Sequence, residues 1–244
     1  MGAEIARGFA DQGWHVVIHH LNSGDEAEAL ASELASAETV QLDLCDDEAA
    51  VDLVENLSAR LPNLRCLINS ASVFRYDHSS MLDNTIYREA MQINALSPVR
   101  MAQTFLACSK GAAPRSVIHI TDMKLENPNP DFFSYTMSKH ALASSIDMFA
   151  MAADADARIY GIAPGAILAS HDQSEDEAET SHRLNLLQRR TNAREVAEAA
   201  MFLAQGALKS GSTLFIDSGQ HLMQQARDVI YLAREPNDTF HSGG

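Results

Sequence analysis

The chain has 244 residues, of which 46% are hydrophobic and 21% are charged, a composition that suits a packed globular core and excludes a disordered chain. It carries 18 Lys and Arg against 33 Asp and Glu, a formal net charge of −15, which argues against nucleic acids and anionic membranes as partners because both carry phosphate charge. No apolar run approaches the roughly 18 residues of a membrane span, and the N-terminus, with Glu4 and Asp11, lacks the pattern of a secretory signal.

The elements expected along the chain alternate between short β-branched apolar runs and amphipathic segments of helical length. The expected strands cover residues 15–19, 39–42, 66–69, 116–121, 158–162 and 213–217, and the expected helices include 25–34, 48–60, 84–108, 135–153 and 193–203. This alternation predicts a parallel, doubly wound sheet with helices on both faces, joined by right-handed crossovers. Because no repeat or linker interrupts it, residues 1–244 are expected to form one α/β domain.

The start of the chain lacks a part that this topology needs. Residues 1–10 have the pattern of the helix that follows a glycine-rich, phosphate-binding turn, with Gly2 as the last glycine of that turn. The strand and the earlier glycines that come before such a helix are missing. Because that first strand is central, its neighbours would each lose a ladder partner, at about 1–3 kcal/mol per buried unpaired group. We therefore expect a sequence whose true start lies upstream, or else a variant in which something else replaces the strand.

Two segments depart from the alternation. Residues 164–190 have a polar, acidic middle at 171–179, and a loop of this length inside a compact domain is typical of a lid over a substrate site. We interpret the acidic run Ser174–Glu179 as a solvated loop and not as a metal site. Residues 222–244 are expected to form an irregular tail that is frayed or serves as an oligomer contact.

Cysteine and histidine usage argues against structural metal. Cys45, Cys66 and Cys108 are odd in number, widely spaced and without a CxxC motif, which favours a reducing, cytoplasmic location with all three as small core residues. The adjacent His19 and His20 point to opposite faces of a strand, and no HxxxH spacing occurs. No metal site is expected.

The most specific chemical signal is Tyr135-Thr136-Met137-Ser138-Lys139, near the start of a helix that follows a strand. Residues at i and i+4 share one helical face, so the Lys139 ammonium is expected to lie near the Tyr135 phenol and lower its pKa. Tyr135 would then be a proton donor near neutral pH.

With further motifs in order, the chain resembles the short-chain dehydrogenase/reductase family from Gly2 to about His221. The motifs are Asp43, Asn69-Ser70-Ala71-Ser72, Asn94 in QINALSP, Ala163-Pro164-Gly165 and Phe215-Ile216-Asp217-Ser218-Gly219. The resemblance implies a Rossmann-like fold and a catalytic set of Asn94, Tyr135 and Lys139. The cofactor-binding residues that it implies are Gly2, Ser23, Asp43, Leu44, Asn69, Ser70, Ala71, Tyr135, Lys139, Pro164 and Gly165.

One departure from the family pattern narrows the class of reaction that the chain is expected to catalyse. The position 13 residues before Tyr135, where the family has a catalytic serine, holds Asp122. An ionised carboxylate cannot donate a hydrogen bond to a carbonyl oxygen as a serine hydroxyl does, so Asp122 favours reduction of a C=N bond. The pattern is similar to the pteridine reductase branch, which has Asp, Tyr and Lys here and NNAS at the cofactor wall. In that branch the position of Phe74 stacks a pterin, so Phe74, Asp122 and Tyr135 are the expected substrate contacts.

The cofactor expectation is NADP. NAD-selective enzymes place an acid at the end of the second strand to hold the ribose 2′-hydroxyl, and this chain has His19-His20-Leu21-Asn22-Ser23 there. Ser23 can bond a 2′-phosphate, although the arginine usual among pteridine reductases is absent, so NAD is not excluded.

These observations predict an NADPH-dependent reductase of a dihydropterin or dihydrofolate, with no nucleic-acid or membrane partner. Two alternatives remain open: a short-chain reductase of carbonyl compounds, and a non-catalytic nucleotide-binding remnant. The resemblance also implies a homodimer or homotetramer that pairs helices 84–108 and 135–153.

Overall fold

The structure is a computed structural model, and it describes residues 1–110, 114–169 and 173–234. Strands and helices alternate along it. The strands are β1 (Val16–His20), β2 (Ala37–Gln41), β3 (Cys66–Asn69), β4 (Arg115–Ile120), β5 (Ala157–Pro164) and β6 (Thr213–Ile216). The α-helices are α1 (Gly2–Asp11), α2 (Gly24–Glu33), α3 (Asp47–Arg60), α4 (Asn84–Met91), α5 (Ser97–Cys108), α6 (Phe133–Ala152), α7 (Glu175–His182), α8 (Ala193–Ala204) and α9 (Val229–Leu232).

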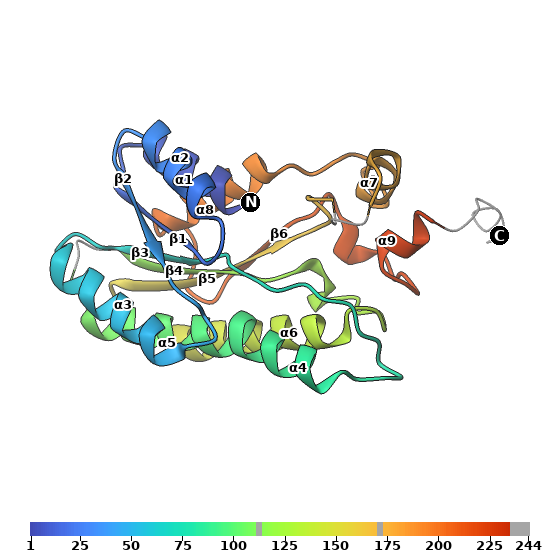
Figure 1. Ribbon diagram of the computed structural model, residues 1–244, viewed down its shortest axis with the longest axis horizontal. Coiled ribbons are helices and arrows are strands. Elements are labelled where there is room, and N and C mark those ends of the chain that lie inside the picture. The colour runs from blue at the N-terminus through green and yellow to red at the C-terminus, as the bar shows by residue number, and fades with distance from the viewer. Residues whose placement is uncertain (111–113, 170–172, 235–244) are drawn as a thin grey trace.

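All strand pairs are parallel, and helices cover both faces of the sheet (Figure 1). Helices α3, α4, α5 and α6 lie on one face, and α1, α2 and α8 lie on the other. The doubly wound, Rossmann-like α/β fold expected from the sequence is confirmed. Alternation along β4 explains the two core layers: Ile118 and Ile120 pack towards α1 and α8, whereas Val117 packs towards α5 and α6.

The sheet is interrupted between β1 and β3. Strand β1 pairs with β2, and β3 begins a separate sheet in the order β3-β4-β5-β6. Among the described residues no strand lies between them, and a cavity of about 870 Å³ is lined by residues of β1, β3 and α1. The gap lies where the sequence analysis expects a strand to be missing, and the open edges of β1 and β3 border this cavity.

Three expectations differ from the structure. The long helix expected over 84–108 is divided by a π-helical turn, η1 (Gln92–Leu96). The acidic segment expected as a loop forms α7, because Ser174 and Glu177 make a reciprocal capping box and acidic side chains in the first turn suit the helix dipole. Cys45 is exposed and not a core residue, whereas Cys66 and Cys108 are partly buried.

The tail after Leu222 also has structure as far as Arg234. It forms the short helix α9, and Val229 and Ile230 are buried; residues 235–244 of the expected irregular tail lie outside the described residues. Within the described ranges, none of the helices has the length and apolar character to cross a membrane.

Candidate active site

The polar residues predicted for catalysis lie near the carboxyl ends of β3 and β4. Asp122 follows β4 and caps the short 3₁₀ helix η2 (Met123–Leu125) by accepting from the Lys124 N–H. Its other carboxylate oxygen, Oδ2, accepts a hydrogen bond of 2.7 Å from the Tyr135 hydroxyl in α6. Asp122 and Tyr135 are therefore joined by one hydrogen bond, and we call these two residues the dyad.

The electrostatics of Tyr135 contradict the sequence expectation. Burial, followed by the charge of Asp122 and the hydrogen bond to it, raises the pKa of Tyr135 well above its ordinary value. Lys139 does not offset this, because its Nζ lies 5.6 Å from the centre of the Tyr135 ring and donates instead to the Ile120 carbonyl at 2.8 Å. Tyr135 is a neutral phenol here, and the predicted lowering of its pKa is wrong for this arrangement.

Asp122 is the other ionisable group of the dyad. Burial raises the pKa of the Asp122 carboxyl. The charge of Lys124 is the largest of the opposing effects, which lower this pKa. A carboxyl with a raised pKa is a suitable proton carrier near neutral pH.

Lys139 is buried in its charged form, and we predict that replacing Lys139 stabilises the protein. Burial lowers the pKa of Lys139 from 10.5 to about 8, so the unfolded chain binds this proton more tightly than the folded chain. As the pH falls from 10.5 through 8, folding therefore loses about 3 kcal/mol. We expect Lys139→Met to raise the free energy of unfolding at pH 7 while activity is lost. Urea unfolding from pH 7 to pH 10 checks this, because the gain should shrink as the pH rises; a gain independent of pH would contradict it.

Asn94 lies fully buried in the π-helical turn η1. Its Oδ1 accepts from the Val73 N–H at 2.8 Å and from the Ser72 hydroxyl at 3.1 Å. Its amide donates to the Val73 carbonyl and to the Ser138 hydroxyl. Asn94 thus ties the segment after β3 to α6, and its expected role in a proton relay remains a prediction.

Phe74 lies against the dyad, as expected for a stacking residue. Its ring is 42% exposed and packs edge-on against Tyr135, with ring centroids 4.7 Å apart. One of its faces is already covered, because the Phe132 ring stacks on it with centroids 4.0 Å apart. Phe132 has a left-handed backbone, φ 53°, a conformation that non-glycine residues adopt rarely and mostly at functional sites.

The expected cofactor-binding residues divide into two groups. One group lines the cavity between β1 and β3: Gly2, Ser23, Leu44, Asn69, Ser70 and Ala71. Outside that lining lie Asp43, Tyr135, Lys139, Pro164 and Gly165. Asp43 is exposed and accepts from the Cys45 N–H. The Asn69 amide faces inward, where it donates to the Pro98 carbonyl and bonds the buried His119 ring.

Gly165 begins the loop after β5 and fits a confined position. A Cβ atom on it would lie 2.7 Å from Gln220 Oε1 and 2.8 Å from Asp217 Cβ. Glycine is therefore required where this loop crosses the turn after β6.

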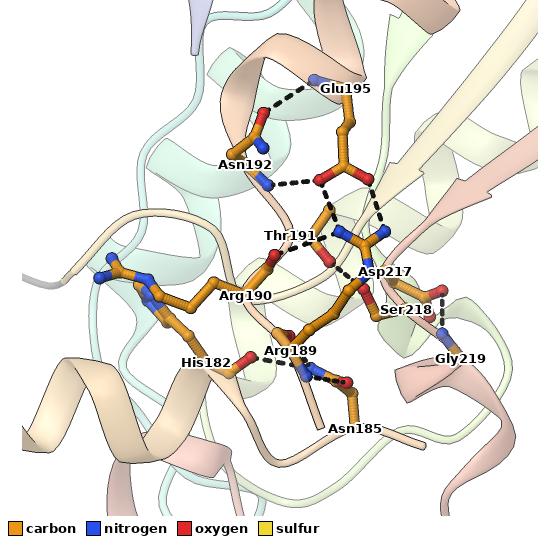
Figure 2. A network of polar contacts seen from close by, with 10 residues as sticks. All are labelled: His182, Asn185, Arg189, Arg190, Thr191, Asn192, Glu195, Asp217, Ser218 and Gly219. Carbon is orange, nitrogen blue, oxygen red and sulfur yellow. Dashed lines mark hydrogen bonds and ion pairs between the residues drawn. The ribbon is translucent and has the colours of Figure 1, made fainter. Parts of the chain in front are cut away.

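The far end of the expected lid segment is fastened to the same turn (Figure 2). The Thr191 and Ser218 hydroxyls bond at 2.7 Å, and Asp217 accepts from the Gly219 N–H. Arg189 makes two hydrogen bonds to Glu195 in α8. Residues 189–195 are thus joined to the turn after β6 and to α8.

The sequence reasoning missed several residues of this site. They are Lys124, Asp131, Phe132, Arg227 and Asp228. Lys124 was the most accessible signal, since it follows Asp122 by two residues. Asp131 and Phe132 closely precede Tyr135 in the sequence, whereas Arg227 and Asp228 approach the dyad only through the fold.

The chain is similar to several known reductases. A family model described as enoyl-(acyl carrier protein) reductase matches residues 1–221. FolM alternative dihydrofolate reductase 1 from Brucella canis, solved in complex with NADP, is 30% identical with a TM-score of 0.85, and the match covers 93% of this chain and 94% of that chain. Dihydromonapterin reductase of Citrobacter koseri is 23% identical over 91% of this chain and 92% of the relative. A protein named as a ketoacyl reductase of the granaticin polyketide synthase, from Streptomyces violaceoruber, is 24% identical over the same shares.

Proposed function

The chain belongs to the short-chain dehydrogenase/reductase family, and on that premise we propose that it is an NADPH-dependent reductase of a C=N bond in a dihydropterin or dihydrofolate ring. The observation that carries the proposal is the Asp122–Tyr135 hydrogen bond of 2.7 Å beside the exposed ring of Phe74. A carboxyl and a phenol suit protonation of a ring nitrogen, and an exposed aromatic ring suits a flat heterocycle. The names of the Brucella and Citrobacter proteins support the same substrate class.

Tyr135 is the residue that meets the substrate nitrogen. Its hydroxyl gives its proton to that nitrogen as the protonated Asp122 carboxyl passes a proton to the phenol oxygen, so Tyr135 is neutral before and after the step. Asp122 ends as a carboxylate and takes up a proton from solvent. Burial raises the pKa of Asp122 and so favours the protonated carboxyl that this transfer needs.

Two of the residues that line the cavity, His20 and Ser23, suit a dinucleotide cofactor. Ser23 begins α2 without making a side-chain cap, and the buried Nδ1 atom of His20 has no hydrogen-bond partner in the described residues. These free groups at a helix N-terminus suit the 2′-phosphate of NADP. Gly2, Ser70 and Ala71 would line the cofactor-binding site, and Lys139 would donate a hydrogen bond to the cofactor ribose. Bound NADPH supplies the hydride for the ring carbon.

Exposed apolar side chains and the cysteines support our inferences about assembly and location. Met137, Met148 and Met151 of α6 are exposed, and covering such apolar side chains favours a homo-oligomer built on this helix. The three cysteines are free thiols, which supports the cytoplasm as the compartment.

Steady-state assays with NADPH and dihydrobiopterin, dihydromonapterin or dihydrofolate test the proposal. Turnover of one of them is expected, together with tighter binding of NADPH than of NADH in calorimetric titrations. Binding of NADPH without turnover of any pterin or folate would overturn the substrate class. Absence of NADPH binding would instead favour the nucleotide-binding remnant.

A carbonyl substrate is the second candidate, favoured by the granaticin-type relative. A panel of ketones and ketoacyl thioesters with NADPH separates it from the first. The variant Asp122→Ser distinguishes the two candidate substrates more sharply.

A further inference from the structure

A buried ion pair lies beside the Asp122–Tyr135 dyad. The Lys124 ammonium is 2.5 Å from the Asp228 carboxylate, with side chains only 5% and 6% exposed. Lys124 Nζ makes no directed hydrogen bond within the described residues, so the contact is mainly one of charge. Charges removed from water to this extent are costly unless they are paired, and such pairs strongly affect neighbouring ionisable groups.

The pair is fixed rigidly to the dyad at one end. The Lys124 N–H donates to Asp122 Oδ1 at 2.9 Å, within the single turn of η2. The Lys124 carbonyl bonds the His140 ring of α6, the helix that carries Tyr135 and Lys139. Lys124 therefore cannot move far from Asp122 without breaking the helical turn.

At the other end the pair is fixed to the C-terminal segment. Asp131, which is fully buried, accepts from Arg227 at 2.7 and 2.9 Å and from the Asp228 N–H at 2.9 Å. The Asp228 carboxylate caps α9 by accepting from the Ile230 N–H. The Lys124 ammonium also lies 5.2 Å from the centre of the Phe132 ring.

We propose that Lys124 and Asp228 are positioning residues whose opposed charges set the pH range over which the Asp122–Tyr135 dyad holds its transferable proton. The kinetic part of this inference rests on the proposed function. Lys124 stabilises the Asp122 carboxylate by its positive charge, and Asp228 opposes this by neutralising Lys124. Other ionisable groups near the pair and the dyad in the described part of the chain include Lys139, Asp131, Arg227 and His140.

The pKa directions agree with this geometry. Against the larger effect of burial, the Lys124 charge lowers the pKa of Asp122. Burial and Asp122 raise the pKa of Tyr135, and the Asp228 charge raises it further. The positive half of the ion pair thus lowers the pKa of Asp122, and the negative half raises the pKa of Tyr135.

The test compares Lys124→Gln with Asp228→Asn. Activity falls on the alkaline side as the dyad loses its proton, so Lys124→Gln should move this fall to higher pH and Asp228→Asn should move it to lower pH. Asparagine can still cap α9, and Lys124→Arg should restore the parental profile. The matched control is Arg194→Gln, which breaks the exposed Arg194–Glu198 pair of α8 and should leave the profile unchanged.

A second readout does not need turnover. Carboxyl-carbon NMR with labelled aspartate, assigned with Asp122→Asn, follows the titration of Asp122 separately from that of Lys139. The pKa of Asp122 should rise in Lys124→Gln and fall in Asp228→Asn even if the substrate is not a pterin. A failed substrate assay with these shifts present would count against the proposed function only.

Shifts in the same direction, or no shift in either variant, would overturn the inference. If a single variant fails to fold, the exchange Lys124→Glu with Asp228→Lys keeps the ion pair and places a negative charge beside Asp122. The NMR titration of Asp122 should then move to higher pH, and an unmoved titration would also overturn the inference.

Discussion

Replacing Tyr135 with phenylalanine is expected to lower kcat by about 10²–10⁴-fold, the usual contribution of a positioned proton donor. The ring remains and can still pack against Phe74, while the hydroxyl that links Asp122 to the substrate is lost. Single-turnover oxidation of bound NADPH, followed by its absorbance, measures the chemical step directly. NADPH affinity should change little, because only the phenol oxygen is removed.

The matched control is Tyr160→Phe. Tyr160 is fully buried in β5, and its hydroxyl donates to the Leu208 carbonyl at 2.6 Å, away from the dyad. This variant loses one buried hydrogen bond, about 1 kcal/mol, and should keep the parental kcat. If Tyr135→Phe also kept it, Tyr135 would not be the proton donor.

Replacing Asp122 with serine is expected to separate the two candidate substrates. Serine lacks the ionisable proton, so reduction of a dihydropterin or dihydrofolate should fall by about 10²-fold or more. A serine hydroxyl can donate to a carbonyl oxygen, so turnover of ketones should rise. The measurement is the ratio of kcat/KM for a pterin and a ketone in parent and variant.

Asp122→Ala is the control, since alanine neither carries a proton nor donates a hydrogen bond. It should lower pterin turnover as serine does, without the gain on ketones. If the parent prefers ketones and Asp122→Ser improves that activity, the enzyme is a carbonyl reductase and the proposed pterin chemistry is wrong.

Local patterns in the sequence were sufficient for the fold and for part of the site. The four-residue spacing of Tyr135 and Lys139 places both on one face of α6. Asp122 was identified by its position 13 residues before Tyr135 in the sequence. The β-branched runs located the strands because buried parallel strands are apolar throughout. The gap in the sheet was also predictable, since the pattern at Gly2 indicated a helix without the strand that precedes it.

Local patterns failed where capping or burial decided the outcome. The acidic segment became α7 through the Ser174–Glu177 capping box, which outweighed its polarity. The left-handed Phe132 has no signature in composition.

The placement of Tyr135 and Lys139 on one helical face was determined by the sequence alone, because the helical repeat brings residues i and i+4 to the same face. The protonation of Tyr135 was decided only by the tertiary structure: burial and the Asp122 carboxylate raise its pKa, while Lys139 turns to the Ile120 carbonyl. The Lys124–Asp228 pair likewise exists only because the fold brings the C-terminal segment against η2. The physical reason is that charge interactions depend on distance and dielectric in space, and the sequence gives distances only along the chain.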